Sequence, residues 1–134
     1  MPLIDSETWE SKFLFLKQLH FHPENPRLPE LRGKNSEAEI IHELCKRGDV
    51  LRVAKAITEK GYFRHDRLIV LREEGRHVVY EGNRRLCALK LLNNWKLAPE
   101  NLQRSYRNLA ERAVLPKKIA VEIVPSKFHA EVVM

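Results

Sequence analysis

The sequence predicts an α+β fold, in which helices surround a small mixed sheet. Apolar stripes with helical spacing lie between residues 36 and 60, and two strand-like runs follow at 68–71 and 77–80. A further helix opens directly after the second run, and residues 119–124 form the last strand-like segment. The 134 residues suffice to bury one core without disulfides or a structural metal, so we expect a single domain.

The composition is that of an ordinary globular protein, with 43% hydrophobic and 31% charged residues. No stretch approaches the roughly 20 apolar residues that a transmembrane helix needs. The first ten residues also lack the basic-then-apolar profile of a signal peptide. We therefore expect a cytoplasmic protein with no membrane partner. The net charge of +6 mildly favours a polyanionic partner, and a merely solvated surface explains it equally well.

Two short helices are expected after a proline-rich loop. Three prolines within seven residues predict that residues 22–30 form an extended, rigid loop. Ser36 then opens a helix, and Glu39 three residues later completes a capping box. Asp49 then caps a second helix, which Gly61 ends.

The two ends of the chain are less regular. The apolar run at residues 12–17 is either a strand or the end of a helix that starts near Asp5. The last five residues, 130–134, stop on apolar side chains with no polar close. This ending favours a piece cut from a longer protein, and an ordinary C-terminus is the alternative.

The junction at residues 80–86 is the part of the sequence most closely tied to chemistry. Gly82 supplies the backbone freedom for a sharp turn, and Asn83 is a preferred N-cap residue. Arg84 and Arg85 then occupy the first helical turn, where the helix dipole disfavours each cation by roughly 0.3–1 kcal/mol. A bound phosphate would compensate, because free N–H groups, the dipole and two guanidinium groups all attract it. The alternative is that both arginines extend into solvent or pair with a nearby glutamate: Glu73, Glu74 or Glu81.

The proline-rich loop is the second candidate segment. Its prolines would present Asn25 and Arg27 with little entropy left to lose. From there Arg27 could reach the same phosphate from the opposite side. The alternative is a purely structural loop.

The cysteines and histidines predict no further site. Cys45 and Cys87 lie on apolar helical stripes and are expected to be free, buried thiols. His20 and His22 alternate, but no second pair at the usual ligand spacing accompanies them, so no metal is expected. A basic stripe could follow a nucleic-acid backbone or form one solvated helix face, and it comprises Arg104, Arg107, Arg112, Lys117 and Lys118.

Taken together, the two candidate segments resemble the ParB/sulfiredoxin-like superfamily. Its members share an Asn-Pro-x-Arg-like loop, a helix ending in glycine, a Leu-Ile-Val strand and a Gly-x-Arg-Arg turn that opens a helix. The matching residues here are Asn25-Pro26-Arg27, Ala56-Ile57 through Gly61, Leu68-Ile69-Val70 and Glu81-Gly82-Asn83-Arg84-Arg85. The resemblance covers about residues 13–94 and a later strand at 121–124. It implies one domain over residues 1–134, with a core at about 13–124.

The resemblance also implies a domain that binds a nucleoside triphosphate, with ATP or CTP as the cofactor and Mg²⁺ beside it. The phosphates would be held by Asn25, Arg27, Gly82, Asn83, Arg84 and Arg85. Glu81, the catalytic candidate, would position a metal or a substrate hydroxyl. Slow triphosphate hydrolysis or phosphotransfer in a DNA-associated or phage-defence protein is the activity implied. The alternative is a DNA-binding or nuclease module that contacts backbone phosphate without a nucleotide.

Two differences from the superfamily limit which of its properties we expect in this chain. Sulfiredoxins have their catalytic cysteine inside this turn, where the present chain has Asn83, and Cys87 would lie one helical turn deeper. We therefore expect no sulfiredoxin chemistry. Partition proteins continue into a helix-turn-helix domain, and we expect none among the residues that follow Pro125 in this sequence.

Overall fold

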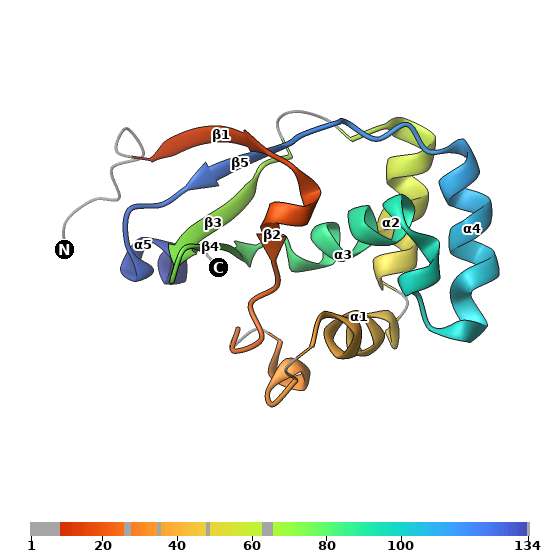
Figure 1. Ribbon diagram of the computed structural model, residues 1–134, viewed down its shortest axis with the longest axis horizontal. Coiled ribbons are helices and arrows are strands. Elements are labelled where there is room, and N and C mark those ends of the chain that lie inside the picture. The colour runs from red at the N-terminus through yellow and green to blue at the C-terminus, as the bar shows by residue number, and fades with distance from the viewer. Residues whose placement is uncertain (1–8, 26–27, 35, 48, 63–65, 134) are drawn as a thin grey trace.

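The computed structural model describes residues 9–25, 28–34, 36–47, 49–62 and 66–133. Within these ranges five strands form one mixed sheet, and helices lie around it (Figure 1). The predicted α+β fold class is therefore confirmed. The strand order is β1-β5-β3-β4-β2. The strands are β1 (Glu10–Leu14), β2 (Leu19–His20), β3 (Leu68–Glu73), β4 (Arg76–Glu81) and β5 (Ile119–Ile123).

The predicted hairpin forms the middle of this sheet. Strands β3 and β4 pair antiparallel, and their two-residue turn has positive φ at both Glu74 (51°) and Gly75 (77°). Two left-handed residues are the signature of a hairpin turn whose twist matches that of the strands. On either side the pairing is parallel, β3 with β5 and β4 with β2, while β1 closes one edge antiparallel to β5.

Four of the five α-helices that the structure describes gather at one end of the sheet, and α5 lies at the other (Figure 1). In Figure 1, α3 leads away from β4, with α1, α2 and α4 around its far part and α5 beside β3 and β4. None of the helices in the described ranges is long and apolar enough to cross a membrane. The α-helices are α1 (Glu37–Cys45), α2 (Asp49–Lys60), α3 (Asn83–Asn93), α4 (Gln103–Arg112) and α5 (Lys127–Val133). Four 3₁₀ turns lie in the connections of the described part of the chain: η2 (Leu16–Gln18), η3 (Pro29–Leu31), η4 (Trp95–Leu97) and η5 (Glu100–Leu102).

Both faces of the sheet carry buried side chains, because successive strand residues point to opposite sides. Val79 lies in the main core with helices α1 to α4. Its neighbour Tyr80 lies in a smaller cluster on the other face, together with Leu71, Val124 and Ala130. The last of these belongs to α5, so this short helix covers one end of the second face.

Two expectations about the N-terminal part can now be compared with the structure. The run at residues 12–17 begins as strand β1 and continues into η2, so the strand alternative holds. The loop at 22–30 is not extended throughout, because it contains η3 with Pro29 at its first position. Proline suits that position, since its fixed φ matches a helical turn and no acceptor is needed for the missing N–H. The buried side chain of Leu31 anchors this turn in the core.

The predicted capping box of α1 yields a stability test. The Ser36 Oγ accepts a hydrogen bond from the Glu39 N–H at 3.1 Å. We expect Ser36→Ala to lower the free energy of unfolding by about 0.5–2 kcal/mol, because that N–H loses its acceptor. Urea unfolding followed by circular dichroism measures the change. Ser105→Ala is the matched control, since Ser105 is exposed within α4 and should lose nothing. Equal losses in both variants would contradict the capping role.

Candidate phosphate site at the start of α3

The turn from β4 into α3 is made at Gly82. Its backbone is left-handed (φ 103°, ψ 23°), and α3 begins at the next residue. A Cβ at this position would lie 2.5 Å from the Leu68 Cδ2, so that only glycine fits without rearrangement. The predicted strand-to-helix junction is confirmed, but the N-cap is Gly82 and not Asn83.

The helix N-terminus at this turn has no side-chain cap. The first hydrogen bond of α3 runs from the Leu86 N–H to the Gly82 carbonyl at 2.8 Å. The N–H groups of the three residues between them precede this bond and have no acceptor within the helix. Together with the positive end of the helix dipole, such N–H groups form an environment that favours an anion.

Two buried amides hold the proline-rich loop against this turn. Asn83, which is 4% exposed, donates its Nδ2 to the Val79 carbonyl at 2.9 Å and accepts the His22 N–H at 3.3 Å. Asn25, which is 5% exposed, donates its Nδ2 to the Tyr80 carbonyl at 3.2 Å. Because Asn83 points into the fold, it cannot cap the helix. Both side chains are therefore suited to positioning the site.

The two arginines lie on different sides of the turn. Arg84 Nε is 3.8 Å from Asp49 Oδ2, at the first residue of α2, and the two side chains are 37% and 41% exposed. Exposed pairs of this kind contribute little. Arg85 folds back, with its Nη2 3.1 Å from the position of a Cβ on Gly82. Burial raises the pKa of the Tyr62 phenol to about 12, and the charge of Arg85 opposes this rise.

All predicted site residues within the described ranges meet at one cavity of about 210 Å³. Arg27 lies outside those ranges. The volume is below the roughly 300–1,000 Å³ of pockets that enclose a drug-sized ligand, so it suits phosphate groups and not a whole nucleotide. Phosphate binding itself stays a prediction. The cavity is lined by Asn25, Leu28, Tyr80, Glu81, Gly82, Asn83, Arg84 and Arg85.

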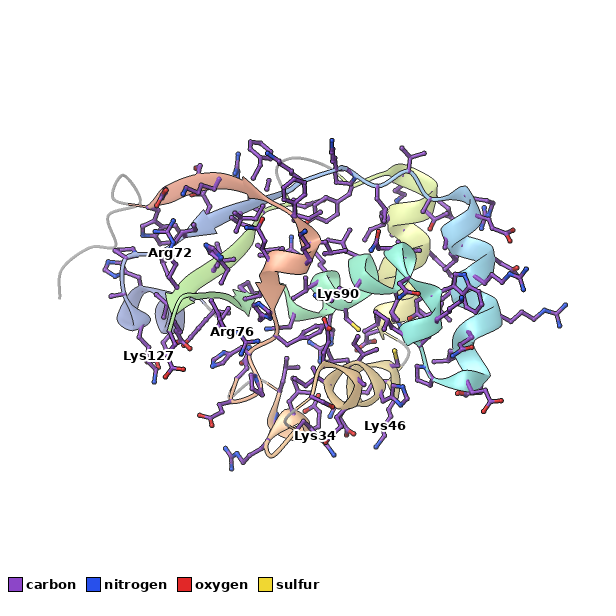
Figure 2. The ribbon with its side chains drawn as sticks, in the orientation of Figure 1. Lys34, Lys46, Arg72, Arg76, Lys90 and Lys127 are labelled. Carbon is purple, nitrogen blue, oxygen red and sulfur yellow. The ribbon has the colours of Figure 1, made fainter. Side chains whose placement is uncertain are left out.

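A larger cavity of about 860 Å³ lies beside β2, and Tyr80 lines both cavities. There the His22 and Tyr80 rings stack at 4.0 Å, the Tyr80 hydroxyl donates to Glu73, and Arg76 Nη2 lies 2.9 Å from His20 Nδ1. Figure 2 shows Arg76 and Lys127 near the hairpin. The lining of this cavity contains more carboxylates than cations, so it suits an anion less well than the turn at Gly82 does. Its charged residues are Glu24, Glu37, Glu73, Glu74, Arg76 and Lys127.

The sequence did not predict the stack of His22 on Tyr80. The two residues come together because β2 pairs in parallel with β4, and no local sequence pattern predicts that pairing. The alternation of side chains along a strand predicts only that His20 and His22 lie on the same face. Across the described residues, no group of three or more His, Cys, Asp or Glu side chains is arranged to hold a metal ion.

The cysteines lie away from the turn. Cys45 and Cys87 are both buried and free, as predicted. Contact with the Cys45 thiol and burial raise the pKa of Cys87 well above its usual value. A thiol held in its neutral form is a poor nucleophile, so Cys87 is poorly suited to nucleophilic chemistry.

Comparisons with known proteins do not establish a family. No protein-family model matches the chain, and no characterised protein sequence matches it either. Among solved structures, the C-terminally truncated chromosome-partitioning protein ParB from Caulobacter crescentus, complexed with CTP-gamma-S, aligns at 16% identity and a TM-score of 0.48. The alignment covers 92% of this chain and 49% of that protein, about half its length. A likeness of this degree supports no conclusion about ligand or function.

The conformation of Gly82 can be tested through stability. We expect Gly82→Ala to cost about 1–2 kcal/mol for a left-handed non-glycine residue, and about 1–3 kcal/mol more for the overlap with Leu68. Gly75→Ala is the matched control, because Gly75 is also left-handed but a Cβ there would meet no atom within 4 Å. Denaturant unfolding of both variants separates the two effects. Equal losses would show that the overlap is absent.

The half-buried His22 predicts a pH dependence. Burial lowers the pKa of His22, against the opposing charge of Glu73. The unfolded chain therefore binds this proton at a higher pH than the folded chain does. The free energy of unfolding should fall as the pH drops below about 6.5, the ordinary histidine value. In His22→Phe, which keeps an aromatic ring, the decline between pH 7 and pH 5 should be shallower than in the wild type. Identical slopes would contradict this origin.

Proposed function

We propose that this chain is a nucleoside-triphosphate-binding domain that holds phosphate groups at the first turn of α3. One observation carries the proposal: the left-handed Gly82 leaves the helix N-terminus without a side-chain cap, and Arg84 and Arg85 flank it. Cations at a helix N-terminus are unfavourable on their own. A bound phosphate converts that unfavourable arrangement into a favourable one, because it accepts from the N–H groups and from both guanidinium groups.

Each element of the turn has a part in this proposal. The missing side chain at Gly82 lets a phosphate oxygen approach the backbone closely. Arg85 already lies over Gly82. Arg84 would exchange Asp49 for phosphate, and the exchange costs little because its present ion pair is long and partly exposed.

The proline-rich loop would support the site from the other side. Asn25 and Asn83 are positioning residues in this proposal, since their amides fix the loop to the end of β4. Arg27, predicted from the sequence to close over the phosphates, keeps that proposed role. Truncation of either amide would lower affinity indirectly, together with stability.

The nucleotide and its turnover rest on the motif resemblance alone, which implies ATP or CTP in a DNA-associated or phage-defence protein. Mg²⁺ is usually bound through one or two carboxylates and the substrate phosphates. Glu81, at the end of β4, contributes to the cavity lining and is the proposed metal- or hydroxyl-positioning residue. Slow hydrolysis or phosphotransfer is part of the proposal. If the wild type releases no phosphate from ATP or CTP, the hydrolysis part of the proposal is wrong.

Calorimetric titration with ATP and CTP, with Mg²⁺ present, tests binding at the turn. We expect Arg84→Ala and Arg85→Ala each to weaken affinity by about tenfold to a hundredfold, because a charge-assisted contact contributes roughly 1.5–3 kcal/mol. Arg107→Ala and Lys117→Ala, outside the cavity, should have little effect. Asp49→Asn removes the carboxylate that competes for Arg84, so it should leave affinity unchanged or raise it. A loss of affinity in Asp49→Asn would contradict the role given to Arg84.

The same groups would also bind a backbone phosphate of DNA, so the alternative function predicts a different pattern. A DNA module would bind no nucleotide at millimolar concentration. Its DNA affinity would fall by similar factors in the turn variants and in Lys117→Ala, with a weaker salt dependence in each. That pattern would replace the nucleotide proposal with the alternative.

A further inference from the structure

The second face of the sheet is covered only in part. At one end α5 buries the cluster around Tyr80 and Val124. At the other end, strand β1 lies at the edge of the sheet and carries Phe13, with Phe15 directly after it. These two residues are 42% and 38% exposed, and they are two of the three large hydrophobic residues exposed within the described ranges.

At least one cationic side chain lies over each ring. Lys118 Nζ lies 5.0 Å and Lys17 Nζ 6.0 Å from the centre of the Phe15 ring. The Arg67 guanidinium carbon lies 5.7 Å from the centre of the Phe13 ring. We call these five residues, Phe13, Phe15, Lys17, Arg67 and Lys118, the aromatic surface.

The charge of the aromatic surface is complementary to a polyanion. Of its three cations, Arg67 forms an ion pair with the Glu122 carboxylate at 3.4 Å. The whole chain carries a net charge of +6. A second copy of the chain placed on this surface would bring like charges together. A polyanion with flat, apolar groups would satisfy both the rings and the cations.

We propose that the aromatic surface binds single-stranded nucleic acid. Exposed aromatic rings on a sheet are platforms on which unpaired bases stack, and neighbouring cations contact the phosphates. A duplex keeps its bases stacked inside and offers no face to these rings. The surface consists of β1, η2 and the segments just before β3 and β5, and it shares no residue with the turn at Gly82.

The structure also divides the basic stripe predicted from the sequence. Arg107 lies over the Trp95 ring at 5.5 Å and pairs with Glu111, whereas Lys118 lies over Phe15. The lysine therefore belongs to the aromatic surface, and Arg107 belongs to the exposed face of α4. Lys118 thus lies over a ring directly after strand β1, whereas Arg107 lies over the Trp95 ring of η4.

Fluorescence anisotropy with a labelled oligothymidylate tests the proposal. Phe13→Leu and Phe15→Leu keep an apolar side chain but remove the ring, and each should weaken binding by about fivefold to a hundredfold. Lys118→Ala should weaken binding and reduce its dependence on salt. Lys34→Ala is the charge-matched control, since Lys34 lies on the opposite side of the molecule from β1 (Figure 2), and it should bind like the wild type. Thermal unfolding confirms that each variant is folded.

Several results would overturn the proposal. One is an oligothymidylate affinity that is the same in Phe13→Leu, Phe15→Leu and the wild type. Another is a duplex of equal length bound as tightly as the single strand. A third is a dimer in sedimentation that the leucine variants dissociate, which would assign the surface to a second copy. The turn variants Arg84→Ala and Arg85→Ala should keep oligonucleotide binding, so this proposal and the triphosphate proposal can fail separately.

Discussion

Gly82 occupies a left-handed conformation close to Leu68, and two buried amides fix the chain around it. Asn83 joins the end of β4 to His22, and Asn25 joins the proline-rich loop to the Tyr80 carbonyl. Leaving any of these polar groups unpaired in the interior would cost about 1–3 kcal/mol. The start of α3 is therefore rigid before any ligand arrives. A preorganised set of donors loses less entropy on binding, which is what a phosphate site requires.

The arrangement of charges differs between the two proposed binding sites, the turn at Gly82 and the aromatic surface. At the turn, a few fixed N–H groups and two arginines act on a small cavity, so a compact, highly charged group is favoured. On the aromatic surface, cations are spread over exposed rings, so an extended ligand with alternating flat and charged groups is favoured. The larger cavity beside β2 has more carboxylates than cations and fits neither description.

Local patterns predicted much of this fold. The N-cap at Ser36, the hairpin and the junction at Gly82 each depend on residues close in sequence, and all three are present. Contacts between distant segments were not predictable in this way. Asn83 suits a helix cap by its residue type, but pairing of β2 with β4 brings His22 to it and turns it inward. Sequence proximity likewise suggests a nearby glutamate as the partner of Arg84, but packing of α2 on α3 provides Asp49 instead.

The most direct test of the phosphate site needs no base at all. Titration of ¹⁵N-labelled protein with inorganic triphosphate, followed by amide chemical shifts, reports on each N–H group separately. The account predicts that the largest saturable shifts are those of Asn83, Arg84 and Arg85, because their N–H groups precede the first hydrogen bond of α3 and have no acceptor within the helix. If the chemical shifts of those amides do not change at millimolar triphosphate, or if only the amides of exposed lysines elsewhere shift, the turn at Gly82 does not bind phosphate.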